Sequence, residues 1–117
     1  MLDNYIVFIG GPGAQVYQTN QDALRIAQET INLNKLLCAI CIAPTILAVA
    51  GVLKNKRATV WNEDKQQQAF LEKYGATYTG EPVTIERNII TCNGPAYVKE
   101  FAKAILEHPL TRAKQQN

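Results

Sequence analysis

The sequence predicts a three-layer α/β/α sandwich with a mostly parallel sheet as its middle layer. Two short runs, Tyr5–Ile9 and Leu36–Ile40, are apolar at every position, as strands buried on both faces are. Each run is followed by a turn signal and then by a helical pattern. Strands that alternate with helices form parallel sheets with helices packed on the faces. The active site of such a sheet lies at the carboxyl ends of its strands.

Four helices are expected between and after these strands. The first follows Thr19 or Asn20, either of which can cap it, and its apolar face carries Leu24, Ala27 and Ile31. The second begins at Pro44 and is apolar nearly all round over residues 44–53, so it should be buried. The third is expected to begin after the cap Asn62 and to end at Gly75. The fourth is expected to begin at Pro95. The predicted core stripe of the last helix is Val98, Phe101, Ala102, Ile105 and Leu106.

The remaining strands are shorter. Ala58–Trp61 is predicted to be a third strand of the same parallel sheet. Residues 77–94 resemble short strands with a turn near Glu86–Asn88 and an Asn-Gly stop at Asn93–Gly94. The chain therefore divides into one α/β domain over residues 1–108 and a polar tail over residues 109–117.

Composition excludes several classes of protein. The chain has 117 residues, enough for one domain, and its 47% hydrophobic content argues against disorder. The net charge is +2 with no basic block, so neither a nucleic acid nor a membrane surface is an expected partner. No apolar run is long enough to span a membrane, and the start does not resemble a signal peptide. Three cysteines, an odd number, suit the reducing cytoplasm.

Cys41 is the residue most open to interpretation, because it follows a buried strand and precedes a buried helix. It can be a small core residue, as Cys38 and Cys92 are expected to be. It can form a Cys-x-x-Cys redox pair with Cys38, although Cys38 lies inside the strand and the two side chains should diverge. Zinc is not expected, because no second pair of ligands completes a site. The third interpretation is a nucleophile on a tight strand-to-helix turn.

The nucleophile interpretation rests on position. A strand, a cysteine, a short turn and a buried helix make a nucleophile elbow, which presents the side chain at the end of the sheet. The start of the following helix favours the thiolate form. A glycine-rich turn after the preceding strand would offer backbone N–H groups to an oxyanion.

Three segments together resemble the ThiJ/PfpI superfamily, which includes intracellular-protease-like proteins and the Parkinsonism-associated deglycase. They are FIGGPGA at residues 8–14, LLCAICIAPTILAVAGVLKNKRAT at 36–59 and IITCNGPAYVKEFAKAILE at 89–107. The resemblance covers essentially the whole chain and implies a flavodoxin-like fold of the class I glutamine amidotransferase type. It also implies that Cys41 is the elbow nucleophile and that Gly11 and the backbone of Ile42 form the oxyanion hole.

The sequence departs from the family pattern in its acid–base groups. Many members carry histidine directly after the nucleophile, where this chain has Ile42, and others carry it at a place taken here by Trp61 or Asn62. The sole histidine, His108, is expected on the surface at the opposite edge of the sheet. Glu63 and Asp64 are possible replacement acids, although stabilisation of the following helix is the favoured explanation for both.

Family members also begin with further strands, a helix and a glutamate that have no counterpart ahead of Tyr5. The chain is therefore expected to be N-terminally truncated relative to the family. It can be a fragment, it can be completed by a homo-oligomer or a second chain that supplies the strands, or its sheet can be rearranged.

Two functions remain open. The resemblance implies a cysteine-dependent hydrolase or deglycase that acts on a carbonyl, a peptide or a glyoxal adduct without a cofactor or metal. The alternative is a non-enzymatic relative in which Cys41 senses oxidants or belongs to a binding site.

Overall fold

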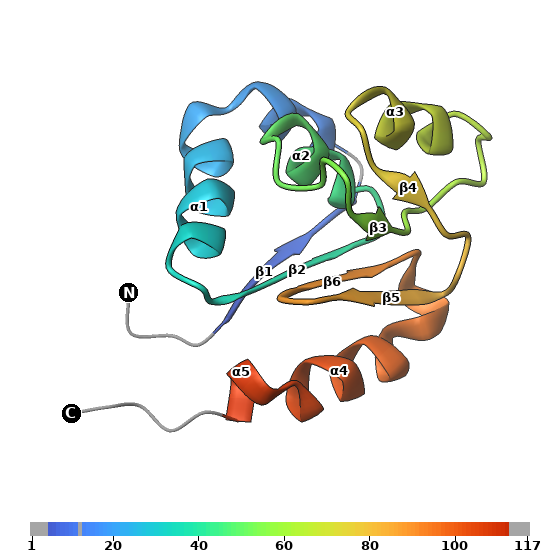
Figure 1. Ribbon diagram of the computed structural model, residues 1–117. Coiled ribbons are helices and arrows are strands. Elements are labelled where there is room, and N and C mark those ends of the chain that lie inside the picture. The colour runs from blue at the N-terminus through green and yellow to red at the C-terminus, as the bar shows by residue number, and fades with distance from the viewer. Residues whose placement is uncertain (1–4, 12, 113–117) are drawn as a thin grey trace.

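A four-stranded sheet in the order β1-β2-β6-β5 forms the middle layer of the molecule (Figure 1). The computed structural model describes residues 5–11 and 13–112. Strands β1 (Tyr5–Ile9), β2 (Leu36–Ile40) and β6 (Ile89–Cys92) are parallel, whereas β5 (Val83–Glu86) runs antiparallel to β6. The predicted bounds of the first two strands and the predicted turn between β5 and β6 are confirmed.

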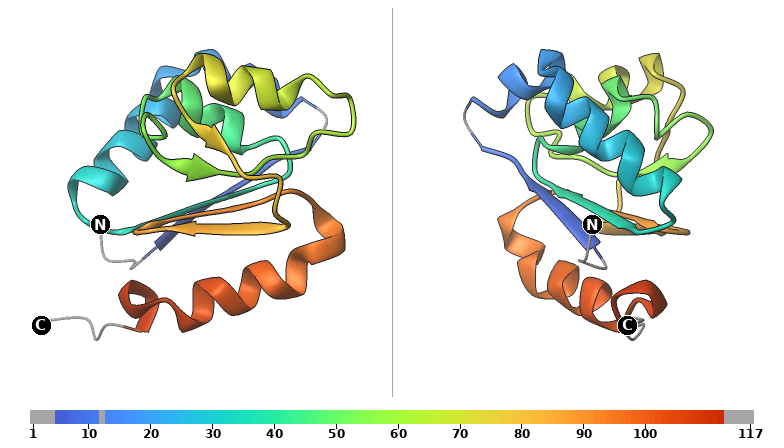
Figure 2. Two further views of the ribbon diagram at one scale, coloured as in Figure 1. Left: turned by 45° about the vertical axis from the view of Figure 1, so that its right-hand side comes forward. Right: turned by 90° about the vertical axis from the view of Figure 1, so that its left-hand side faces the viewer.

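Helices cover both faces of this sheet, which confirms the predicted α/β/α class (Figures 1 and 2). None of the helices in the described ranges is long and apolar enough to cross a membrane. One face carries η1 (Ala14–Thr19), α1 (Gln21–Asn32), α2 (Pro44–Val49) and α3 (Gln67–Lys73), and the other carries η2 (Pro95–Tyr97), α4 (Val98–Glu107) and α5 (Pro109–Arg112).

Local sequence signals explain where these helices begin and end. Asn20 caps α1, because its side-chain oxygen accepts a hydrogen bond from the N–H of Ala23 at 3.0 Å. Helix α2 starts at Pro44 and is buried along its length, as predicted. It ends at Val49, not at residue 53, because Gly51 turns the chain with a left-handed φ of 86°.

The predicted third strand of the main sheet is wrong. Only Arg57–Ala58 is a strand, β3, and it pairs with β4 (Thr77–Tyr78) in a separate two-stranded sheet. The backbone donors after Ala58 are used outside a strand ladder. The N–H of Thr59 donates to the hydroxyl of Thr91 at 2.9 Å, and the N–H of Trp61 donates to the backbone oxygen of Cys41 at 2.9 Å.

Only part of the stripe predicted for the last helix is buried. Phe101 and Ile105 pack against the sheet, whereas Val98 and Leu106 are 51% and 62% exposed. Helix α4 contacts β5 and β6 along one narrow strip, so the side that carries Val98, Ala102 and Leu106 turns away from the sheet. The core on this face comprises Leu36, Cys38, Ile40, Ile90, Cys92, Phe101 and Ile105.

His108 lies at the amino end of β6, opposite the edge that carries Cys41, as predicted. It is half-buried, however, and not a free tail residue. Its Nε2 donates to the backbone oxygen of Arg87 at 2.7 Å, and its Nδ1 accepts from the N–H of Leu110 at 3.1 Å. The first residues of the expected tail form α5, and residues 113–117 lie outside the described ranges.

Candidate active site

Cys41 directly follows β2 and has a φ of 64°, in the left-handed region that residues other than glycine rarely adopt. The strained turn predicted at this position is therefore confirmed. The backbone of Cys41 is held on both sides. Its N–H donates to the oxygen of Cys92 at 3.0 Å, and its oxygen accepts from the N–H of Trp61 at 2.9 Å. Strain that is held in place by its surroundings is a feature of functional sites.

Gly10 lies against this turn. An ideal Cβ built on Gly10 would stand 2.6 Å from the nitrogen of Ala43 and 2.8 Å from that of Ile42. Only glycine permits this close approach of the two backbones. Sequence reasoning did not single out Gly10, although the double glycine was the available signal. Gly11, by contrast, has open space around its Cβ position.

The two groups predicted to form an oxyanion hole lie close to this contact. Ile42 is only 6% exposed, and its oxygen accepts bonds from the N–H and the hydroxyl of Thr45. Across the described part of the chain, no acceptor lies within hydrogen-bonding distance of the N–H of Ile42 or of Gly11. Pro12, the centre of the glycine-rich turn, falls outside the described residues. A role for either N–H in binding an oxyanion stays a prediction.

The thiol of Cys41 has no hydrogen-bond partner among the described residues, and burial raises its pKa above the ordinary value. This direction is opposite to the expectation that the following helix would favour the thiolate. Helix α2 has only six residues, so its dipole is short. The other two thiols are free and buried, and burial raises the pKa of Cys38 to about 12. Cys38 and Cys41 are therefore two free thiols and do not form a Cys-x-x-Cys disulfide in this structure.

The two candidate acids have different surroundings. Asp64 is exposed and accepts from the N–H of Gln66 at 3.0 Å and from the side chain of Gln67 at 2.9 Å. These bonds lower the pKa of Asp64. They also explain its position, because they stabilise the start of α3. Glu63 accepts from the indole N–H of Trp61 at 3.1 Å. Neither acid has a hydrogen bond to Cys41.

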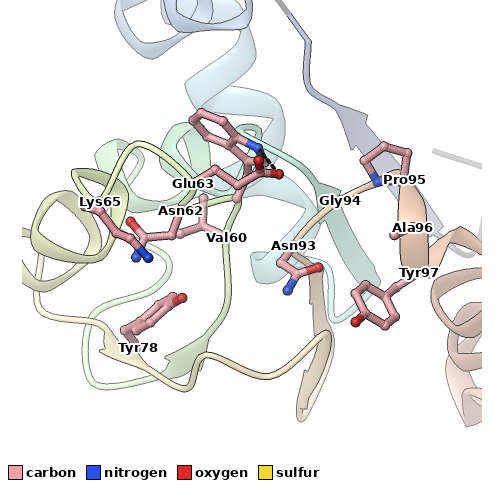
Figure 3. Close-up of a pocket in the computed structure, with 11 residues that line it drawn as sticks. Val60, Asn62, Glu63, Lys65, Tyr78, Asn93, Gly94, Pro95, Ala96 and Tyr97 are labelled. Atoms are coloured by element: carbon pink, nitrogen blue, oxygen red, sulfur yellow. Dashed lines mark hydrogen bonds between the residues drawn. The ribbon is translucent and has the colours of Figure 1, made fainter.

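A cavity of about 450 Å³ lies beside the elbow, and Figure 3 shows its lining. Cys41 does not itself line the cavity, but Trp61, which donates its N–H to the oxygen of Cys41, lies in one wall and the segment after Cys92 forms the opposite wall. Glu63 is one of its residues. Sequence reasoning missed most of this lining, which comes from three separate segments. The lining residues are Val60, Trp61, Asn62, Glu63, Lys65, Tyr78, Asn93, Gly94, Pro95, Ala96 and Tyr97.

No cluster of histidine, cysteine and carboxylate side chains that could hold a metal occurs in residues 5–11 and 13–112. The fold and the elbow thus define a flavodoxin-like α/β protein with a strained cysteine at the carboxyl edge of its sheet.

The chain belongs to the DJ-1/PfpI family, whose model matches residues 3–108. It is 38% identical over 108 residues to the uncharacterized protein MJ0967 of Methanocaldococcus jannaschii, covering 90% of this chain and 52% of that protein. It is 32% identical over 106 residues to the glutathione-independent glyoxalase DJ-1 of Schizosaccharomyces pombe, covering 90% and 53%. The structure superposes on a ThiJ/PfpI domain protein from Brachyspira murdochii with a TM-score of 0.82, at 26% identity and with 88% and 58% covered. The chain spans about half the length of the Methanocaldococcus jannaschii and Schizosaccharomyces pombe proteins.

Proposed function

We propose that Cys41 is the nucleophile of an enzyme that acts on small reactive carbonyl compounds, of which 2-oxoaldehydes and their adducts are examples. The observation that carries the proposal is the left-handed turn at Cys41, braced by the close approach of Gly10. A buried cysteine that served packing alone would not need this strained backbone. The glyoxalase name of the Schizosaccharomyces pombe relative supports the choice of substrate class.

The proposed chemistry begins with addition to the carbonyl group. The thiolate of Cys41 forms a bond to the carbonyl carbon, and the carbonyl electron pair moves to oxygen. The N–H groups of Ile42 and Gly11 are candidates to stabilise that oxyanion. Protonation of the oxygen gives a thiohemiacetal. Peptide or amide hydrolysis fits less well, because the leaving amine needs a proton donor and no described acid contacts Cys41.

An acid or base for later steps can come from Glu63, which lines the cavity, or from a second polypeptide.

Exposed apolar side chains support a second polypeptide as a partner. Ile9 is 79% exposed at the end of edge strand β1, and Val16 and Tyr17 are exposed on η1. We propose that a second copy or another chain covers this region, in the cytoplasm. Light scattering coupled to size exclusion tests the partner, and a clean monomer near 13.0 kDa would contradict it.

The test of the nucleophile uses a 2-oxoaldehyde labelled with carbon-13 at its aldehyde carbon. We expect a thiohemiacetal signal in the carbon spectrum of the wild-type protein. The signal should be absent in Cys41→Ala and present in Cys38→Ala, a matched control because Cys38 lies on the strand that leads to Cys41 but is fully buried. Equal signals in both variants would refute the assignment. Consumption of the aldehyde, followed in parallel, separates adduct formation from turnover.

A second function is favoured by one observation: neither of the two candidate acids has a hydrogen bond to Cys41. In this case Cys41 is a binding or oxidant-sensing thiol and not a catalyst. The pH dependence of alkylation tests whether the thiol is activated. Because burial raises the pKa of Cys41 and a raised pKa lowers the thiolate fraction at neutral pH, alkylation should rise only at a higher pH than that of free cysteine. A profile shifted to lower pH would show an activated thiolate, which the enzyme and an oxidant sensor both need, and turnover of the aldehyde would then decide between them.

A further inference from the structure

The three cysteines of this chain gather on one face of the sheet. Cys38 and Cys92 belong to the buried core beneath α4, and Cys41 packs against the same core from the carboxyl edge. All three thiols are free. The proposed function uses only Cys41, which leaves a fully buried thiol, Cys92, beside the nucleophile without a role.

Backbone geometry places Cys41 and Cys92 within reach of each other. The N–H of Cys41 donates to the oxygen of Cys92 at 3.0 Å. The two Cα atoms are joined by the N–Cα bond of Cys41, this hydrogen bond, and the span from the oxygen to the Cα of Cys92. Laid end to end, these three lengths add up to about 6.9 Å, and bends at the nitrogen and the oxygen make the real distance shorter. Disulfides join Cα atoms that lie about 4.4–6.8 Å apart.

The thiol of Cys92 also points to the correct end of the sheet. Its sulfur donates to the oxygen of Gly94 at 3.5 Å and approaches that of Tyr97 at 3.8 Å, and both residues follow β6 at the carboxyl edge. Cys38 is less well placed. It pairs in register with Ile90, two residues before Cys92, and such diagonal neighbours lie about 7–8 Å apart.

Exposure fixes the order of events. Cys41 is half-buried at the edge, whereas Cys92 is fully buried, so a dissolved oxidant meets Cys41 first. We propose that Cys92 is a resolving thiol, which captures Cys41 after oxidation by a hydroperoxide and forms an internal Cys41–Cys92 disulfide. The inference needs the Cys41 thiolate but no carbonyl chemistry, so it can fail or succeed independently of the proposed enzyme.

The reaction proceeds in two balanced steps. The Cys41 thiolate attacks the terminal oxygen of the hydroperoxide, the O–O bond breaks, and the alkoxide leaves and takes up a proton as the alcohol. The product is the sulfenic acid of Cys41. Cys92 then loses its proton and attacks this sulfur, the S–O bond breaks, and hydroxide leaves as water with that proton. One hydroperoxide is reduced by two electrons while two thiols become one disulfide.

The disulfide would have two consequences in this fold. It removes the nucleophile reversibly and protects it from further oxidation to the sulfinic acid. It also draws the Cys92 sulfur away from the oxygens of Gly94 and Tyr97, which belong to a wall of the cavity. Oxidation would therefore change both the thiol and the neighbouring cavity.

The experiment treats the full chain with one equivalent of hydrogen peroxide, blocks free thiols under denaturing conditions and maps peptides by mass spectrometry. Trypsin leaves Cys38 and Cys41 on one peptide, residues 36–54, and Cys92 on another, residues 88–99. The Cys38→Ala variant therefore makes the assignment unambiguous. We expect it to lose two hydrogens per chain and to yield a 36–54/88–99 cross-link that a dithiol reverses.

Two further variants complete the test. Cys41→Ala should give no cross-link. Cys92→Ser should give none either, and it should accumulate sulfenic acid at Cys41, trapped by dimedone, followed by sulfinic acid. If Cys92→Ser does not fold, the cross-link in Cys38→Ala decides the matter alone. A wild-type protein that passes to sulfinic acid without a cross-link, or a Cys38–Cys41 disulfide, would overturn the proposal.

Discussion

Replacing Gly10 by alanine tests how tightly the elbow is built. The added Cβ would stand 2.6 Å from the nitrogen of Ala43 and 2.8 Å from that of Ile42, closer than real Cβ atoms approach backbone. Neither contact is the end of a flexible side chain, so the β1 turn and the elbow must move apart. Gly11→Ala is the matched control, because nothing lies within 4 Å of its Cβ position.

The size of the effect follows from two opposing contributions. Overpacking of a well-packed region costs about 1–3 kcal/mol, and two backbone contacts place Gly10→Ala toward the upper end. Alanine also lowers the conformational entropy of the unfolded chain, which stabilises both variants by about 0.4–1 kcal/mol. We therefore expect Gly10→Ala to lose about 1–2 kcal/mol and Gly11→Ala to be neutral or slightly stabilised. At about 4 °C per kcal/mol, the two melting temperatures should differ by about 8 °C.

Thermal melts followed by circular dichroism measure this difference, and alkylation of Cys41 under native conditions reports on the elbow itself. We expect Gly10→Ala to change the alkylation rate and Gly11→Ala to leave it near that of the wild type. Melting temperatures that agree within about 1 °C would show that the turn after β1 moves freely. The close approach would then have no part in holding Cys41 in its left-handed conformation.

Three further substitutions test the surroundings of the site. Cys38→Ser should lower the free energy of unfolding in urea by about 1–3 kcal/mol, because a buried hydroxyl needs a partner, and an unchanged midpoint would contradict full burial. Glu86→Gln should destabilise by up to about 1 kcal/mol at neutral pH. Hydrogen bonds from Arg57 lower the pKa of Glu86, so its contribution is complete above the unfolded pKa and is lost as pH falls through the lower folded one. The free energies of unfolding of the variant and the wild type should therefore converge as the pH is lowered below the unfolded pKa, and a difference that does not narrow would refute the link. Asn62→Ala should lose about 1 kcal/mol, because the Asn62 oxygen accepts from the N–H groups of Gln67 and Gln68 at the start of α3, and an unchanged melt would rule out this cap.

The features that could be predicted from the sequence are those encoded in short contiguous segments. Strands β1 and β2 are continuous apolar runs that end at a glycine and at a Cys-x-x-Pro turn, so their bounds and the elbow at Cys41 followed directly. The turn between β5 and β6 and the start of α2 at Pro44 were equally local.

The features that could not be predicted depend on distant residues. The segment after Ala58 reads as a strand, yet the N–H of Thr59 donates to the side chain of Thr91 and the N–H of Trp61 to the backbone oxygen of Cys41, about thirty and twenty positions away. Gly10 and Gly11 are identical as letters, and only the packing of the elbow distinguishes them. The direction of the Cys41 pKa shift depends on burial, which the sequence does not state.

The two edges of the sheet differ in a way that limits how copies of this chain can assemble. Beside β5, the Arg57 guanidinium donates to the oxygen of Ile85 at 2.9 Å and the hydroxyls of Thr79 and Thr84 meet at 2.6 Å, so this edge is already occupied. On the other side, β1 has only β2 as a neighbour among the described strands. Pairing of β1 with β5 would be head-to-tail and would propagate into a filament. With the β5 edge blocked, edge-to-edge contact can only join β1 to β1 about a two-fold axis, which closes after two copies.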